Sequence, residues 1–186
     1  MKTNKLSFNP FPAINTKRLL LRRLLLEDAP EVYFLRTDTQ VNQFVKRPQP
    51  KNLIEAEQFI AKINQGIDNN ENIYWAIAIK GSDKMIGSIS LWHFSENQKI
   101  AEVGYDLHTK LHGKGYMSEA LRAVLNYGFK NIHLEQITAF TQKNNLKSLQ
   151  LLRKHRFLLE EGRVDESNIE NAIFSINKPV FNNKSR

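Results

Sequence analysis

Cysteine is absent from the 186-residue sequence, and no stretch approaches the roughly 20 apolar residues that a membrane-spanning helix needs. The first absence excludes disulfides, thiol nucleophiles and thiolate metal sites. The second argues against insertion in a membrane. We therefore expect a soluble, cytoplasmic protein that has no membrane partner.

A signal-peptide core is also lacking, because the N-terminal stretch MKTNKLSFNPFPAINTK is interrupted by asparagine and proline. Repeats, low-complexity tracts and linkers are missing as well. Hydrophobic residues make up 41% of the chain and charged residues 25%, which is typical of a globular protein. We expect a single domain over residues 1–186, with a core from about 16 to 178 and a loose C-terminal tail, PVFNNKSR.

Acidic residues are outnumbered: 19 Asp and Glu stand against 27 Lys and Arg, which gives a net charge of +8. Such an excess favours an anionic partner, which can be nucleic acid, the ribosome or a phosphorylated cofactor. A basic but otherwise ordinary surface explains it equally well, because the chain has no dense Lys/Arg tract. The charge alone does not decide between these alternatives.

The apolar pattern divides the chain into strands and helices. Strand patterns cover residues 16–24, 72–81, 85–94, 100–107, 134–142, 157–164 and 171–178, while helical spacing covers 30–38, 52–67, a segment ending near 131, and 146–156. Residues 72–107 have the turns and alternation of an antiparallel meander, and a strand–helix–strand unit follows it. The sequence therefore predicts an α+β domain with about seven strands and about four helices.

Two glycines flank a lysine in LHGKGYMSEAL, residues 111–121, directly before a predicted helix. A helix N-terminus has unpaired N–H groups and partial positive charge, so it attracts phosphate. Gly113 and Gly115 would let the main chain approach such a ligand, although they can equally form a turn that only caps the helix. The P-loop pattern is excluded because Gly115, and not Ser or Thr, follows Lys114. A dinucleotide fingerprint would need glycine at Ser118.

Four motifs occur along the chain in the order TKRLLLRRL, AEVGYDL, HGKGYMSEAL and NNLKSLQLLRKHRF. Together they resemble the GCN5-related N-acetyltransferase (GNAT) superfamily. Asn145 and Ser148 make the chain most similar to the branch of ribosomal-protein N-terminal acetyltransferases, the RimJ/RimL type. The resemblance covers about Thr16 to Lys178. It implies a GNAT fold, in which a central mixed, mostly antiparallel, twisted sheet is splayed at the acetyl-CoA site.

The resemblance also implies acetyl-CoA as the cosubstrate, with no metal. The family's signature R/Q-x-x-G-x-G/A falls on His112, Gly113, Lys114, Gly115, Tyr116 and Met117. Backbone amides from there to Ser118 would cradle the pyrophosphate, while the backbone of Tyr105, Asp106 and Leu107 would pair with the pantetheine arm. Two positions depart from the signature, since His112 replaces Arg or Gln and Met117 replaces Gly or Ala.

Acetyl transfer from a thioester to an amine needs an unprotonated amine, a donor for the oxyanion and a proton for the departing thiolate. Glu102 is the candidate base, and glutamate at this position in the branch commonly lines the acceptor site. Alternation along the strand would place Glu102 and Gly104 on one face and Val103 and Tyr105 on the other. The alternative for Glu102 is a solvent-exposed strand residue without a catalytic role.

Asn145 and Ser148 stand one helical turn apart at the start of the last predicted helix, so both can face one ligand. We expect both to contact the cofactor, with Ser148 as a hydrogen-bond donor to the CoA sulfur. Helix capping by Asn145 is an alternative that can coexist with cofactor contact. Many family members carry a tyrosine seven residues after this asparagine, but Leu152 stands there in this chain.

The function predicted from these residues is an acetyl-CoA-dependent N-acetyltransferase that acts on a primary amine by direct attack in a ternary complex. The acceptor is left open between a protein N-terminal α-amine and a small-molecule amine, and the protein between monomer and homodimer. A non-catalytic acyl-CoA-binding or sensor domain is the alternative, favoured by the missing tyrosine. A basic RNA-binding module rests on charge alone without an RNP-like motif, so we expect no direct nucleic-acid binding.

Overall fold

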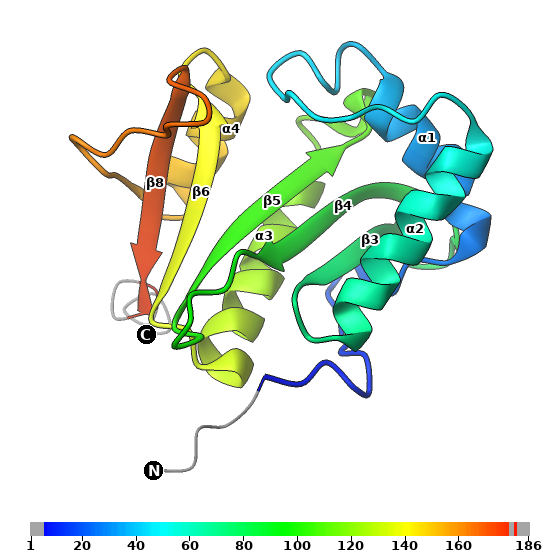
Figure 1. Ribbon diagram of the computed structural model, residues 1–186, viewed down its shortest axis with the longest axis horizontal. Coiled ribbons are helices and arrows are strands. Elements are labelled where there is room, and N and C mark those ends of the chain that lie inside the picture. The colour runs from blue at the N-terminus through cyan, green and yellow to red at the C-terminus, as the bar shows by residue number, and fades with distance from the viewer. Residues whose placement is uncertain (1–5, 179–180, 182–186) are drawn as a thin grey trace.

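A computed structural model describes residues 6–178 and residue 181, and its centre is an eight-stranded mixed sheet (Figure 1). The strand order is β1-β2-β3-β4-β5-β6-β8-β7. The strands are β1 (Ile14–Asn15), β2 (Leu19–Arg22), β3 (Ile73–Ile79), β4 (Met85–Trp92), β5 (Ile100–Leu107), β6 (Gln136–Gln142), β7 (Leu158–Leu159) and β8 (Asn171–Asn177). All neighbours are antiparallel except β5 and β6, which are parallel.

Among the described residues, four helices cover the two faces of the sheet: α1 (Ala29–Thr37), α2 (Leu53–Asp68), α3 (Tyr116–Tyr127) and α4 (Leu146–Lys154). Helices α1 and α2 pack with Ala76 and Met85 in one buried cluster. Helices α3 and α4 share a second, larger cluster that includes Trp75 and Val103. Alternation along each strand therefore sends odd-numbered side chains of β3 and β5 to the α3/α4 face and even-numbered ones to the α1/α2 face.

Short turns complete the chain around these elements. Two 3₁₀ turns, η1 (Leu26–Asp28) and η2 (Thr109–Leu111), precede α1 and α3, and a π-helical turn, η3 (Gly128–Ile132), follows α3. The parallel pair β5 and β6 is joined by α3, which is the crossover that a parallel pair requires. The predicted strand–helix–strand unit is confirmed.

The sheet opens between β5 and β6. Their ladder contains only three pairs, and the last joins Glu102 to Thr138. Beyond that pair β5 continues to Leu107 and β6 to Gln142 as diverging arrows in Figure 1. Within the described residues no strand occupies the β6-facing edge of β5 from Val103 onward, which confirms the splay expected from the resemblance.

The predicted elements agree with the structure, and most differences lie at their ends. The first predicted strand shortens to β2, because Thr16 forms a turn with Leu19. The predicted strand 157–164 shrinks to the two residues of β7, and a turn follows. The tail PVFNNKSR lies outside the described residues except for Phe181, whose ring centroid is 5.1 Å from that of Phe129. No described helix is both long and apolar enough to span a bilayer.

Candidate active site

Glu102 lies on β5 at the point where the sheet opens, and its side chain faces the α1/α2 side. One carboxylate oxygen, Oε2, is 3.1 Å from Nδ1 of His93, and the Glu102 side chain is 15% exposed. The His93 ring stacks on Trp92 at 4.1 Å, and the His93 backbone has φ +46°, a left-handed conformation that is uncommon outside glycine. Glu102 is therefore a largely buried carboxylate oriented by His93, and not a solvated surface residue.

Burial raises the pKa of Glu102, because a carboxylate is less stable away from water. The hydrogen bond and charge of His93 and a hydrogen bond from Trp92 act in the opposite direction, while the nearby charge of Asp165 adds to the rise. A base needs a pKa closer to the working pH than that of a free carboxylate. The direction of the shift suits Glu102 for accepting a proton.

Ser148 lies on the other side of the splay, in the first turn of α4. Its N–H donates to Oδ1 of Asn145 at 3.2 Å, so Asn145 caps the helix as one alternative predicted. The Ser148 hydroxyl lies 2.7 Å from the phenol oxygen of Tyr105, which reaches across from β5. Tyr105 packs against the same buried cluster as Val103, on the α3/α4 face.

Glu102 and Ser148 consequently approach from opposite faces of the sheet. Even-numbered Glu102 belongs to the α1/α2 face, whereas odd-numbered Tyr105 and its partner Ser148 belong to the α3/α4 face. A closed sheet would separate these groups, but the ladder between β5 and β6 ends at Glu102. The splay is therefore the place where a ligand bound on one face can meet a reactant on the other.

The open edge of β5 presents main-chain groups to this gap. The N–H of His108 donates to the carbonyl of Ile86, and antiparallel pairs alternate in their bonding. The backbone groups of Val103 and Tyr105 therefore point away from β4 and toward the splay. The carbonyl of Leu107 points the same way but lies 2.9 Å from Nε2 of His112, which leaves Leu107 its N–H.

Asp106 behaves differently from its two neighbours. Its backbone pairs with Ser88 of β4, so it does not present main-chain groups to the gap as Tyr105 does. Its carboxylate, 7% exposed, accepts from Ser88 Oγ at 2.6 Å and from Arg47 at 2.8 Å. Arg47 also donates to Asn42 and to the Leu35 carbonyl, so Asp106 holds the segment between α1 and α2 against the sheet.

The glycine loop enters α3 with two left-handed residues. Gly113 has φ +76° and Gly115, the N-cap of α3, has φ +78°, conformations that favour glycine. A Cβ added at Gly113 would meet nothing within 4 Å, so open space lies beside the main chain. Among the described residues, no backbone partner receives the N–H groups of Gly113 to Ser118, and the first bond of the helix runs from Glu119 to Gly115.

The side chains around the loop explain how it tolerates its departures from the signature. His112 binds the carbonyl of Leu107 and lies 3.5 Å from the Lys147 ammonium, which links the loop to α4. Met117 is 8% exposed and its side chain enters the core, leaving its N–H at the loop. The Ser118 hydroxyl lies 2.9 Å from Nε2 of His155, so this hydroxyl joins α3 to the end of α4. Among the described residues, the Ser118 N–H has no backbone partner and is open to an anion.

Arg18 braces the loop, and sequence reasoning assigned it no role. Its Nη1 donates to the Lys114 carbonyl at 2.9 Å, and its Nε donates to Glu119 at 2.7 Å. Its guanidinium lies 4.5 Å from the centroid of Tyr116, and Thr16 also donates to Glu119. Two features of the sequence could have indicated this role: the basic TKR directly before a strand, and Glu119 in the first turn of α3.

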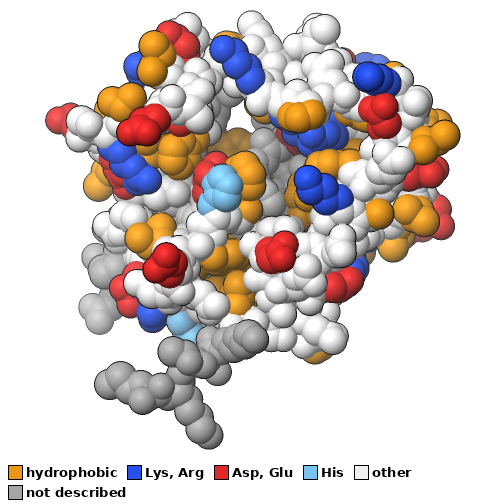
Figure 2. Space-filling view, in the orientation of Figure 1, with side chains coloured by type: hydrophobic (Ala, Val, Ile, Leu, Met, Phe, Trp, Pro, Cys, Tyr) orange, Lys and Arg blue, Asp and Glu red, His pale blue; other side chains and the backbone are white. Residues whose placement is uncertain are grey.

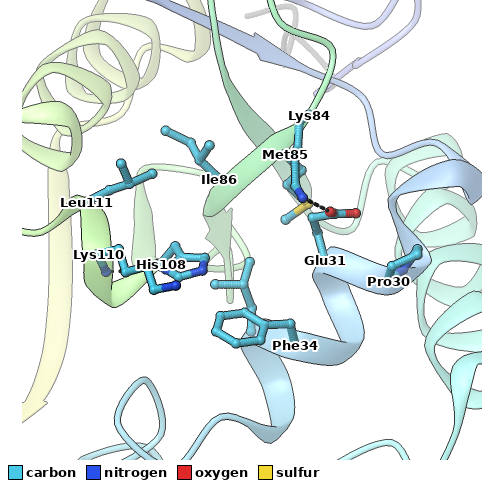
Figure 3. A pocket seen from close by; sticks show the side chains of 10 residues that line it. Pro30, Glu31, Phe34, Lys84, Met85, Ile86, His108, Lys110 and Leu111 are labelled. Carbon is cyan, nitrogen blue, oxygen red and sulfur yellow. Dashed lines mark hydrogen bonds and ion pairs between the residues drawn. The ribbon is translucent and has the colours of Figure 1, made fainter.

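A cavity of about 410 Å³ lies between α1, the start of β4 and the residues after β5 (Figure 3). Phe34 and His108 stack at its wall with ring centroids 4.5 Å apart, and Lys84 pairs with Glu31 across it. Neither Glu102 nor Ser148 lines this cavity. Its contribution to the site is indirect, because the stacked His108 fixes the segment that leads into the glycine loop.

His108 and His112 are four residues apart, which on an α-helix would place both on one face. The 3₁₀ turn between them sends His108 to Phe34 and His112 to the Leu107 carbonyl. Within residues 6–178 and 181, no group of three or more His, Asp or Glu side chains could hold a metal ion.

Charge on the face shown in Figure 2 is mixed, with basic and acidic side chains interspersed around a hollow near its centre. Histidine and hydrophobic side chains are exposed beside that hollow. The net charge of +8 therefore forms no continuous basic surface on this face. This arrangement gives no support to a broad nucleic-acid contact there.

Comparison with known proteins identifies relatives of this architecture. The family model described as an acetyltransferase (GNAT) domain matches residues 18–158. The uncharacterized N-acetyltransferase YnaD of Bacillus subtilis is 31% identical over 142 residues, which cover 76% of this chain and 79% of YnaD. The ribosomal-protein-serine acetyltransferase of Escherichia coli is 31% identical over 78 residues, 42% of this chain and 44% of that enzyme. A solved structure of RimL, a ribosomal alpha-N-protein acetyltransferase in complex with coenzyme A, superposes with a TM-score of 0.76 at 18% identity, over 91% of this chain and 99% of RimL.

Proposed function

Because the chain belongs to the GNAT acetyltransferase family and is an acetyl-CoA-dependent enzyme of that family, we propose that it transfers the acetyl group to the α-amine of a protein N-terminus by direct attack in a ternary complex. The acceptor class is suggested by relatives named as ribosomal-protein acetyltransferases. The observation that carries the mechanism is the position of the splay, which begins at Glu102 and opens the sheet between the face of Glu102 and the opposite face, where Ser148 lies.

Acetyl-CoA supplies an activated acyl thioester, and the α3/α4 side of the splay has groups that fit it. The unpaired N–H groups of residues 113–118 and the positive end of the α3 dipole would hold the pyrophosphate. The free edge of β5 at Val103 and Tyr105 would pair with the amide groups of the pantetheine arm. Binding from this side would leave the other face for the acceptor.

Glu102 would take the proton that the attacking amine loses. An N-terminal amine is largely protonated at neutral pH, and attack needs its lone pair. Two groups on the α1/α2 face, where Glu102 lies, would contact the acceptor chain. They are Trp92, which is 40% exposed, and the segment between α1 and α2 that contains Arg47. Ser148 would donate a hydrogen bond to the leaving sulfur, which lowers the cost of its developing negative charge.

The test is release of free CoA from acetyl-CoA in the presence of N-terminal peptides and small primary amines, followed by mass spectrometry of the products. We expect acetylated peptide α-amines, and we expect small amines to react less efficiently. Efficient acetylation of small amines alone would overturn the acceptor assignment and leave the transfer chemistry in place. Tight acetyl-CoA binding with no CoA release for any acceptor would instead indicate a binding domain.

A further inference from the structure

Tyr105 and Ser148 form a pair of hydroxyls at the splay. The two oxygens are 2.7 Å apart, one on β5 and the other on α4, so their hydrogen bond links β5 to the helix that follows β6. The position in α4 where a tyrosine could have stood is Leu152, which is completely buried in the core. A phenol is therefore present at this site, but it comes from the strand and not from the helix.

Either oxygen can donate in this hydrogen bond, and the chemistry of the two hydroxyls favours Tyr105 as the donor. A buried phenol O–H requires an acceptor, and it is a stronger donor than a serine hydroxyl because it is more acidic. When the Tyr105 O–H donates to Ser148 Oγ, Ser148 uses a lone pair and keeps its own hydrogen for a third group. Burial also raises the pKa of Tyr105 to about 12, so the phenol keeps its proton.

The position of Ser148 is fixed twice. Its N–H is held by the side chain of Asn145, and its Oγ is held by Tyr105. A serine side chain otherwise has three staggered rotamers. The pair therefore favours one rotamer of Ser148 and limits the directions open to its remaining O–H.

We propose that Tyr105 is a positioning residue, whose phenol orients the Ser148 O–H toward the sulfur of the CoA leaving group. The inference rests on the proposed function for the presence of CoA in the splay. In the reaction the amine nitrogen forms a bond to the acetyl carbon, the carbon–sulfur bond breaks, and sulfur keeps the electron pair. Glu102 takes the amine proton, Ser148 stabilises the thiolate by its hydrogen bond, and Tyr105 gives up no proton.

The affinity for CoA, measured without any acceptor, tests whether Tyr105 orients Ser148 toward the sulfur. Above the thiol pKa of about 8.5, CoA is a thiolate, so the parent protein should bind CoA roughly tenfold more tightly than desulfo-CoA. Calorimetric titrations give the affinity for CoA divided by the affinity for desulfo-CoA. Ser148→Ala should bring this ratio to about one, and Tyr105→Phe should reduce it roughly 3- to 10-fold. The double variant should match Ser148→Ala, because Tyr105 acts only through Ser148. Affinity for desulfo-CoA should be unchanged throughout.

Turnover gives a parallel measurement. Ser148→Ala should lower kcat by roughly 10- to 10²-fold and Tyr105→Phe by roughly 3- to 10-fold, with KM for acetyl-CoA unchanged and no further loss in the double variant. Tyr127→Phe is the matched control, because it removes another partly buried phenol O–H, on α3, whose ring contacts Trp75. It should leave both measurements at the parent value.

If Tyr105→Phe keeps the parent's ratio of CoA affinity to desulfo-CoA affinity, the positioning role is wrong. It is also wrong if Tyr105→Phe causes the same loss in the Ser148→Ala background as in the parent. If the parent binds CoA but does not distinguish it from desulfo-CoA, the sulfur contact is wrong while the cofactor assignment stands. If the parent binds neither ligand, the proposed function fails and this inference fails with it.

Discussion

The glycine loop and the acceptor face lie on opposite sides of one sheet and are built from different parts of the chain. The loop is a continuous segment, residues 112–118, and it offers main-chain N–H groups at a helix N-terminus. The acceptor face depends on side chains from separate elements, such as Glu102 of β5, His93 after β4 and Arg47 between α1 and α2. Backbone recognition tolerates changes of side chain, whereas the acceptor face should lose function with single side-chain changes.

The largest expected effect on the loop comes from Gly115→Asp. The variant places a negative charge beside the proposed pyrophosphate position and a Cβ 3.4 Å from Arg18 Nη2. We expect affinity for acetyl-CoA to fall by at least roughly 10²-fold, measured by calorimetry or by the thermal shift that the ligand produces. Gly162→Asp is the control, because Gly162 has nearly the same φ, +79°, with nothing within 4 Å of the added Cβ. Parent-like binding by Gly115→Asp would show that the anion does not bind at this loop.

On the acceptor face, Glu102→Gln should separate chemistry from binding. The amide keeps the shape of the side chain but cannot accept the proton, so turnover near neutral pH should fall by roughly 10²-fold with acetyl-CoA affinity unchanged. The loss should shrink at high pH, where the amine is already unprotonated. Glu135→Gln changes an exposed carboxylate that pairs with Lys99, and it should have no effect. Unchanged turnover of Glu102→Gln at pH 7 would contradict the base role.

His93→Ala tests whether His93 sets the pKa of Glu102. His93 lowers the pKa of Glu102 against the effects of burial and of Asp165, so its removal should raise that pKa further. Because only the ionised carboxylate is a base, the acid limb of the kcat/KM profile should move to higher pH, with roughly a 3-fold loss near pH 6 and little loss at pH 9. His133→Ala is the control, since His133 is also left-handed, with φ +65°, but lies at the end of η3. A uniform loss at all pH values would indicate a packing role for His93.

The difference between the two regions also explains what the sequence could predict. Residues 100–107 form the predicted strand, and the glycine loop leads into the predicted helix, because alternation and helix-start signals act over short distances. The partners of these residues are set by tertiary contacts. The pairing of Arg18 with Glu119 and of Tyr105 with Ser148 joins residues 101 and 43 positions apart, a separation at which no local pattern operates.

Leu152 is a second position whose tertiary contacts the sequence could not predict. The absence of a tyrosine there can be read from the sequence, and from the sequence alone Leu152→Tyr is the simplest way to restore a donor beside Ser148. In the structure Leu152 is completely buried, so a phenol would overpack the core at a cost of about 1–3 kcal/mol. The hydroxyl that does reach Ser148 comes from Tyr105. Spacing along α4 indicated a missing group but could not indicate its substitute from β5.

The smallest expected effect concerns the brace that holds the loop to β2. Burial alone would raise the pKa of Glu119, but hydrogen bonds from Thr16 and Arg18 outweigh it and lower the pKa to about 2. A carboxyl with a lowered pKa stabilises the fold above its ordinary pKa of about 4.3, and this contribution is lost as the pH falls toward 2. Glu119→Gln should therefore lower Tm by a few degrees, roughly 2–6 °C, at pH 7 and by less at pH 3, measured by thermal melts at both pH values. An equal drop at both pH values would assign the effect to packing. Glu102→Gln is the comparison variant, because it should lower turnover without lowering Tm. Glu119→Gln should instead lower Tm more than it lowers turnover.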